Sequence, residues 1–179
     1  MELYWRETMT CPTEEDYLEM ASNKTGGLFR LAIRLMQEES AISNVADFIS
    51  LATNIGVVYQ ILDDLLNLTS SAYNRSKGFC EDLSEGKFGF PLIRAIRSDP
   101  QNKVLMNIFK LKTTDLEVKK QAVSYIELMG GFADTETILS ELMNSTLNLV
   151  SECQTIVGGQ EGIIGADKVK QILGSFEMR

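Results

Sequence analysis

The chain has 179 residues, 44% of them hydrophobic and 23% charged, which suits one globular domain or part of one. The formal net charge of −8 argues against a nucleic-acid-binding protein, because such proteins need a basic surface. The sequence contains no histidine, which excludes His-based catalytic triads and His-ligated zinc within it, so metal chemistry would use oxygen ligands and favour Mg²⁺.

Two helices are expected near the start of the chain. The first covers 13–22 and begins like a capping box, with Thr13 followed three residues later by Asp16. The second covers about 28–39, where apolar residues recur at helical spacing. Between them lies KTGG (24–27), whose two glycines are expected to break or bend the helix.

A long helix and a long loop are expected in the middle of the chain. The helix covers about 43–68, where one apolar stripe runs at helical spacing. The loop covers 69–87, which is polar and contains glycine, and loops of this length are often functional. A short helix follows over 90–98, with Pro91 in its first turn. Further helices are expected near 103–111, 115–129, 133–156 and 166–178. Since no useful length alternates with period two, the expected fold class is all-α, a helical bundle.

Cellular location is indicated by three features of the sequence. The N-terminus, MELYWRETMT, has no signal-peptide pattern, and no run of eighteen apolar residues predicts a transmembrane helix. The three cysteines, Cys11, Cys80 and Cys153, are widely spaced and resemble neither a disulfide framework nor a zinc site. We therefore expect a reducing, cytoplasmic location.

Two adjacent aspartates interrupt an apolar run in YQILDDLLNL (59–68). On a helix, Gln60, Asp63, Asp64 and Asn67 share one face, because their spacings are three, four and seven. Such an oxygen-rich, anionic face needs a cation, lysine or arginine beside it. Mg²⁺ takes one or two carboxylates and completes its shell with waters and substrate phosphates. The residues alone leave two interpretations open: exposed aspartates on an ordinary helix, or a magnesium–diphosphate site.

Three lysines at irregular backbone positions favour the second interpretation. Lys24 and Thr25 precede two glycines, and the helix that starts there would point free N–H groups at an anion. Lys77 and Lys87 each stand beside a glycine, which lets backbone and ammonium approach an anion closely. Any one of these lysines is typical of a solvated surface, and the P-loop pattern is absent. Only their combination with the aspartates indicates diphosphate binding.

Four segments in a fixed order then resemble a known family: YWRETMTCPTEEDY, NKTGGLFRLAIRLM, YQILDDLLNL and KGFCEDLSEGKFGFPLIRAI. Together they are similar to the trans-prenyl diphosphate synthases, or polyprenyl synthetases, and most to the geranylgeranyl diphosphate synthases of fungi and animals. The resemblance is strongest over 1–98. It implies an isoprenoid-synthase fold with an apolar cavity, and Mg²⁺-dependent condensation of isopentenyl diphosphate with an allylic diphosphate, from farnesyl to geranylgeranyl diphosphate. The allylic diphosphate ionises, the alkene attacks the cation, and a proton is lost.

The resemblance also implies roles for the acidic residues. Asp63, Asp64 and Asn67 match the second aspartate-rich motif, which binds Mg²⁺, and Asp63 is favoured as a direct ligand. Asn67 stands at a position where many relatives carry aspartate, and asparagine is usual in the geranylgeranyl type. Leu62 stands where relatives usually carry arginine, so an ion pair of the family is expected to be missing.

Substrate contacts are implied for five further positions. Lys24 and Thr25 match a pair that contacts the allylic diphosphate and lies near the path of the departing proton. Lys77 and Lys87 match lysines that contact the same diphosphate. Gln60 matches a glutamine near the substrate, so the expected catalytic residues are Lys24, Thr25 and Gln60.

One family motif does not occur in the sequence. The first aspartate-rich motif, D-D-x-x-D, is absent, as are the basic residues that bind isopentenyl diphosphate. We therefore expect 1–179 to form the C-terminal half of a single all-α domain. Its expected partner is the N-terminal half or a full-length synthase, in a homo- or hetero-oligomer, and an apolar helix face should be exposed without it.

Two alternatives accompany this expectation. A truncated synthase could act without catalysis as a binding or regulatory subunit, because the first motif is missing. A terpene cyclase shares the fold and the metal chemistry, but its N-D-x-x-S-x-x-x-E motif is not found in this sequence.

Overall fold

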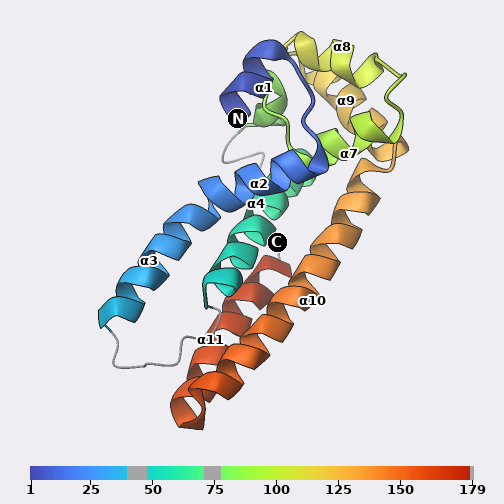
Figure 1. Cartoon of the computed structure of the whole chain (residues 1–179). Coiled ribbons are helices and arrows are strands. Elements are labelled where there is room, and N and C mark those ends of the chain that lie inside the picture. The colour runs from blue at the N-terminus through green and yellow to red at the C-terminus, as the bar shows by residue number, and fades with distance from the viewer. Residues whose placement is uncertain (40–47, 71–77, 178–179) are drawn as a thin grey trace. The chain divides into compact units, whose positions relative to one another are not determined.

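The computed structural model describes residues 1–39, 48–70 and 78–177, and all regular elements in these ranges are helices (Figure 1). The expected all-α fold class is therefore confirmed. The chain divides into two compact units. Unit 1 consists of Met1–Met20 and Ile61–Ile138, and unit 2 of Ala21–Gln60 and Leu139–Arg179. Each unit is described by itself.

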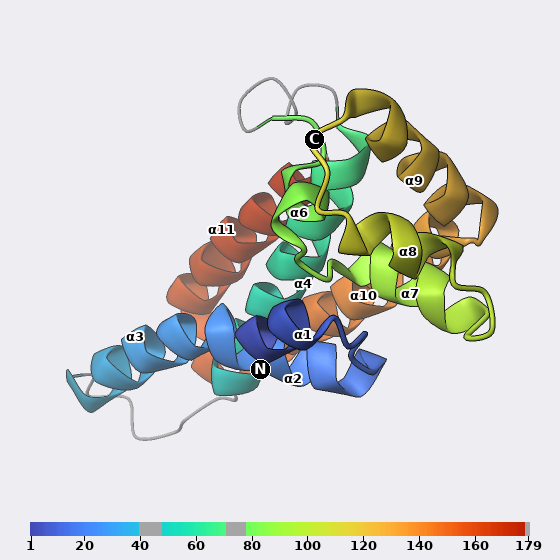
Figure 2. The ribbon, with the colours of Figure 1, turned by 90° about the horizontal axis from the view of Figure 1, so that it is seen from above.

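Unit 1 contains most of the short helices. They are α1 (Glu2–Thr8), the start of α2 (Glu14–Lys24), the end of α4 (Phe48–Thr69), α6 (Glu81–Glu85), α7 (Phe90–Ser98), α8 (Val104–Lys110), α9 (Leu116–Leu128) and the start of α10 (Gly131–Val157). The predicted capping box is confirmed, since Asp16 N–H donates to Thr13 Oγ1 at 3.0 Å and Thr13 N–H to Asp16 Oδ2 at 3.2 Å. Figure 2 shows α9 beside α7 and α8, which it contacts.

The core of unit 1 is built around α7. Six of its nine residues are buried, including Phe90 and Ile93, which are fully buried. The start of α10 approaches α7 so closely that a Cβ atom on Gly131 would lie 2.5 Å from the carbonyl oxygen of Pro91. Only glycine fits at that contact, because a Cβ atom so near a backbone oxygen would overlap with it. Because α7 is packed in this way, the residues just before it are held in a fixed position.

Arg94 and Arg97 join α7 to the N-terminal segment of unit 1. The Arg94 guanidinium forms ion pairs with Glu14 of α2 and with Asp134 of α10, the latter at 2.9 Å. Arg97 donates to the carbonyl oxygens of Cys11 and Pro12. These bonds satisfy backbone acceptors just before α2 and fix its start.

Unit 2 contains the longer helices. They are α3 (Gly26–Glu39), the first part of α4, most of α10, and α11 (Gly159–Glu177). Its buried cluster consists of Leu51, Val150, Cys153, Ala166 and Leu173. Gly158 and Gly159 have positive φ values of 68° and 57°, which glycine adopts readily, and they form the turn between α10 and α11.

The predicted helices agree with the observed ones except at short or weakly patterned segments. Helix α7 has the bounds that the sequence predicts, and α2 and α3 meet at the predicted break. The prediction of a loop over 69–87 is wrong at α6, which is only five residues long. Helix α1 was not expected, and α11 begins seven residues earlier than predicted. The start of the predicted 43–68 helix falls partly outside the described residues.

Helix α4 is long and apolar enough to cross a membrane by length and composition alone. Half of its most apolar window is buried within the molecule. The core helix of a globular protein meets the same criterion. This property is therefore weak evidence for a membrane span.

Candidate diphosphate and metal site

The polar face of α4 is largely buried. Gln60, Asp64 and Asn67 have exposed fractions of 8%, 1% and 4%, whereas Asp63 is partly exposed. A buried carboxylate is stable only with partners that replace water. The interpretation of exposed aspartates on an ordinary helix is therefore wrong for Asp64. The donors that bind its carboxylate show which residues surround it.

Asp64 binds three donors from two other segments of unit 1. Its Oδ2 accepts hydrogen bonds from the Tyr17 hydroxyl at 2.6 Å and from the Phe90 N–H at 2.9 Å. Its Oδ1 lies 3.7 Å from the ammonium Nζ of Lys87. Burial, reinforced by the charge of Asp64, raises the pKa of Tyr17 well above its usual value, so Tyr17 stays a neutral donor.

Lys87 is held between two carboxylates. Its Nζ lies 3.2 Å from Asp82 Oδ1 and 3.3 Å from Asp82 Oδ2, with Asp64 on its other side. Burial acts to lower the pKa of Lys87, but the charges of Asp64 and Asp82 outweigh it and raise the pKa. The lysine is therefore a permanent cation, and its side chain is 17% exposed.

Asp82 belongs to the same cluster. Burial raises its pKa to about 6, and Asp64 adds to that effect, although Lys87 opposes it. Its backbone N–H donates to Asn67 Oδ1 at 3.4 Å, which connects the start of α6 to α4. Asp64, Asn67 and Lys87 are thus brought together by short-range contacts in unit 1.

A second cluster lies in unit 2, at the break between α2 and α3. Helix α2 ends at Lys24 and α3 begins at Gly26, with Thr25 between them. The Thr25 hydroxyl donates to Gln60 Oε1 at 3.0 Å. This approach requires glycine, because a Cβ atom on Gly56 would lie 2.8 Å from both the Cα and N atoms of Gly26.

Arg30 stabilises the break from inside unit 2. Its guanidinium donates to the carbonyl and hydroxyl oxygens of Ser22, both at 3.0 Å, and to Asn23 Oδ1 at 3.1 Å. A longer contact of 3.4 Å reaches Thr53 of α4. The Arg30 guanidinium provides hydrogen-bond donors at the end of α2, where the helix carbonyl groups favour a positive charge.

The structure therefore places the predicted site residues in two clusters. Thr25 and Gln60 meet in unit 2, where Lys24 is exposed at the end of α2. Asp64, Asn67 and Lys87 meet in unit 1, and Asp63 is the neighbour of Asp64 on α4. The predicted contact residue Lys77 lies outside the described residues.

The oxygen ligands suit a magnesium ion only in part. Among the described residues, no three acidic or cysteine side chains form a group that could hold a metal ion. Mg²⁺ commonly takes one or two protein carboxylates together with waters and phosphates, and the partly exposed Asp63 fits that mode. Asp64 and Asn67 are buried and bind protein donors. The assignment of all three residues to Mg²⁺ stays a prediction.

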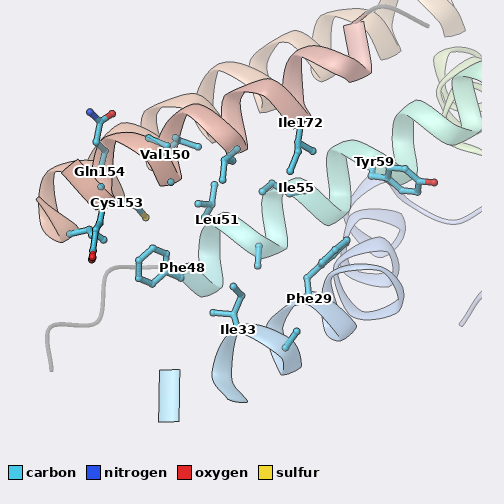
Figure 3. Close-up of a pocket in the computed structure, with 18 of the residues that line it drawn as sticks. Phe29, Ile33, Phe48, Leu51, Ile55, Tyr59, Val150, Cys153, Gln154 and Ile172 are labelled. Atoms are coloured by element: carbon cyan, nitrogen blue, oxygen red, sulfur yellow. The ribbon is translucent and has the colours of Figure 1, made fainter. Parts of the chain in front are cut away.

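Unit 2 also contains an apolar pocket of about 600 Å³. Figure 3 shows side chains from four helices around it: Phe29 and Ile33 of α3, Phe48, Leu51, Ile55 and Tyr59 of α4, Val150, Cys153 and Gln154 of α10, and Ile172 of α11. Its walls are almost entirely hydrocarbon. Tyr59, which lines it, is the chain neighbour of Gln60.

Three residues of these clusters were missed in the sequence. Tyr17 lies in an amphipathic helix where an apolar position is ordinary, Asp82 lies in an expected loop, and Arg30 looks like a surface charge. Glycine beside Lys87 indicated a special backbone there, but no pattern showed which carboxylates face it. Tyr17 and Asp64 are 47 residues apart, a separation that local spacing does not connect.

Comparison with known proteins decides the family. A model of the polyprenyl synthetase family matches residues 1–126. The chain belongs to the polyprenyl synthetase family. Among curated relatives of this family, it is 54% identical over 159 residues to geranylgeranyl pyrophosphate synthase 1 of Zymoseptoria tritici, covering 85% of this chain and 46% of the relative. It is 48% identical over 179 residues to a geranylgeranyl pyrophosphate synthase of Aspergillus fumigatus, covering 100% of this chain and 48% of the relative.

A solved structure agrees at the level of the fold. The chain matches the geranylgeranyl pyrophosphate synthase of Lactobacillus brevis with a TM-score of 0.77 and 19% identity. The match covers 94% of this chain and 53% of that structure. Like the curated matches, it spans about half of the other polypeptide. The resemblance to polyprenyl synthetases and to their isoprenoid-synthase fold is confirmed.

Proposed function

We propose that this polyprenyl synthetase chain supplies one half of an Mg²⁺-dependent prenyltransferase that condenses isopentenyl diphosphate with farnesyl diphosphate to give geranylgeranyl diphosphate. The observation that carries the proposal is Lys87, a permanent cation held at the acidic face of α4. The names of the relatives support the substrate class, since both fungal relatives are geranylgeranyl pyrophosphate synthases. The chain spans about half of their length, so the complete reaction needs the remainder of the fold.

Each cluster contains groups that would stabilise a departing diphosphate. In unit 2, Lys24 at the end of α2 and the neighbouring Thr25 would bind diphosphate oxygens. In unit 1, Lys87 beside α4 would do the same, with Lys77 as a further predicted contact. Diphosphate leaves readily only when its growing charge is neutralised. Magnesium, when bound through Asp63, would neutralise part of that charge. Gln60, held by Thr25, would lie near the substrate, and Lys24 and Thr25 would lie near the path of the departing proton.

The apolar pocket of unit 2 would hold the prenyl chain. An allylic cation must be protected from water, which hydrocarbon walls achieve. A pocket of about 600 Å³ lies in the range typical of small-molecule sites. Tyr59 and Gln60 are consecutive, so the apolar wall of the pocket and the polar Gln60 adjoin within unit 2.

The partner would be the other half of the synthase fold, as an N-terminal half or within a full-length synthase in a homo- or hetero-oligomer. Its contact would be the α3 stripe, formed by Leu28, Leu31, Leu35 and Met36, whose exposed fractions are 72%, 56%, 61% and 68%. At 100° per residue, the apolar residues of α3 cover about 200° of the helix, twice the arc of an ordinary surface helix. Phe29 and Ile33 line the pocket, so the α3 stripe needs a second neighbour. We propose a cytoplasmic location for this assembly.

A second candidate is a non-catalytic subunit that binds and regulates a complete synthase. The two candidates differ in one respect: only a catalytic half should lose product when its own metal and diphosphate residues are changed.

The test mixes the chain with the unmatched half of the Zymoseptoria tritici relative and measures incorporation of labelled isopentenyl diphosphate into farnesyl diphosphate. Asp63→Asn is expected to lower the rate roughly a hundredfold, the usual effect of removing an electrostatic contact in the transition state. Asp167→Asn, on the exposed surface of α11, is the matched control and should leave the rate unchanged. Elongation that Asp63→Asn does not affect would favour the non-catalytic subunit.

A further inference from the structure

Asp64 has two oxygens with different partners. Oδ2 accepts from Tyr17 at 2.6 Å and from the Phe90 N–H at 2.9 Å, while Oδ1 faces Lys87 at 3.7 Å. The carboxylate is 1% exposed. A magnesium ligand must present an oxygen to the metal, whereas both oxygens of Asp64 are directed at protein donors.

The bond to Phe90 caps a helix from outside it. Phe90 is the first residue of α7, and its N–H has no acceptor within the helix. The N-cap residue, Gly89, has no side chain that could accept it. Asp64 of α4 provides the missing acceptor, and its charge also suits the positive end of the helix. The position of α7 on α4 therefore depends on Asp64, and Lys87 lies three residues before α7.

Tyr17 orients this carboxylate. Its side chain is fully buried, and its ring packs against that of Phe90 with centroids 5.1 Å apart. The hydroxyl binds the same Oδ2 that caps α7, which leaves Oδ1 directed at Lys87. Asp82 then holds the ammonium group through both of its own oxygens.

We propose that Asp64 is a positioning residue: oriented by Tyr17, its carboxylate anchors the start of α7 and thereby places Lys87 for contact with a diphosphate. This inference rests on the proposed function for the role of Lys87. In this proposal, Asp63 provides the metal contact of α4, and Asp64 supports the site by holding other residues of the protein in position. Tyr17 becomes a residue of the site, although it would touch neither substrate nor metal.

Tyr17→Phe tests the anchor without changing charge or ring packing. NMR of the full chain would follow two signals: hydrogen exchange at the Phe90 amide and the ordered ammonium group of Lys87. Tyr17→Phe should speed exchange at Phe90 and broaden the Lys87 signal. Tyr125→Phe is the matched control, because it also removes one hydroxyl contact in unit 1, to Asn102, away from α4. The control should change neither signal, and unchanged signals in Tyr17→Phe would overturn the inference.

Asp82→Asn keeps the inference testable if Tyr17→Phe does not fold. This variant should loosen the Lys87 ammonium group but leave the Phe90 amide protected, since Asp64 holds that amide directly. Loss of protection at Phe90 would show that Asp82, not Asp64, anchors the segment, and would overturn the inference.

A binding measurement connects the anchor to the ligand. Calorimetry of the chain mixed with the unmatched half of the Zymoseptoria tritici relative would use magnesium and inorganic pyrophosphate. The dissociation constant should be about tenfold higher for Tyr17→Phe than for Tyr125→Phe, the effect of losing one hydrogen bond to a charged group. The denaturation midpoint of each variant shows whether folding changed instead. Equal dissociation constants in the two variants would overturn the inference. If pyrophosphate does not bind the unmodified chain mixed with the unmatched half of the relative, the proposed function fails, and the two NMR signals still decide whether Asp64 anchors the segment.

Discussion

Gly56→Ala is expected to destabilise unit 2, although alanine is the better helix former. An exposed or unhindered glycine in a helix, replaced by alanine, gains about 1 kcal/mol. At Gly56 the new methyl group would lie 2.8 Å from the Cα and N atoms of Gly26. Carbon contacts relax at roughly 3.5 Å or more, so the start of α3 would have to move by about 0.7 Å. Both obstructing atoms belong to the backbone, so no side chain can turn away.

The sign of the effect follows from comparing these two magnitudes. Overpacking of a tight contact costs about 1–3 kcal/mol, which exceeds the gain in helix propensity. We therefore expect a net loss of about 1 kcal/mol in the free energy of unfolding. The movement would also stretch the 3.0 Å bond between Thr25 and Gln60, one turn further along α4.

Gly165→Ala is the matched control for this prediction. Gly165 also lies inside a helix of unit 2, but a Cβ atom there would meet nothing within 4 Å. This variant should gain up to about 1 kcal/mol. Urea unfolding followed by circular dichroism measures both. If Gly56→Ala stabilised the chain as much as Gly165→Ala, the close approach of α3 to α4 would be refuted.

Two further predictions concern the surface and the thiols. Leu31→Asp, in the α3 stripe, should abolish binding of the chain to the unmatched half of the Zymoseptoria tritici relative in size-exclusion chromatography, whereas Leu128→Asp, at an equally apolar position that is 76% exposed, should not. Equal binding by both variants would reject the stripe as the contact. Burial raises the pKa of the Cys11 thiol to about 11, although Arg97 opposes it, so alkylation at pH 8 should be roughly a hundredfold slower than for a free cysteine and should rise until about pH 11. An alkylation rate that levels off near pH 9 would contradict that environment.

Helix positions could be predicted where a local signal marks an end. Pro91 in the first turn of α7 and the glycines of KTGG set boundaries that the structure reproduces. Helix α6 has only five residues, too few for an apolar period to show, and its ends depend on left-handed backbone at Cys80 and Gly86. Helix α11 begins at Gly159, earlier than predicted, because the positive φ values of Gly158 and Gly159 complete the turn after α10 within two residues.

The candidate site could be predicted by residue type but not by contact. The spacing of Gln60, Asp63, Asp64 and Asn67 correctly placed them on one helix. It could not distinguish the partly exposed Asp63 from the buried Asp64, because burial depends on residues far away in the sequence. Tyr17 approaches from α2, and Phe90 from α7. Such partners are set by tertiary packing, which periodicity does not encode.

The burial of Asp64 determines how damage to this region would be observed in a cell. Removing one partner of a buried charge typically costs about 3–5 kcal/mol, a large share of the stability of an ordinary domain. Inherited substitutions at Asp64 would therefore reduce the amount of folded protein before they changed its chemistry, because proteases would remove the unfolded chains. A change at Asp63, which is partly exposed, would leave normal abundance and an impaired protein. Substitutions at these two adjacent aspartates would thus give different phenotypes: less folded protein for Asp64, and impaired function at normal abundance for Asp63.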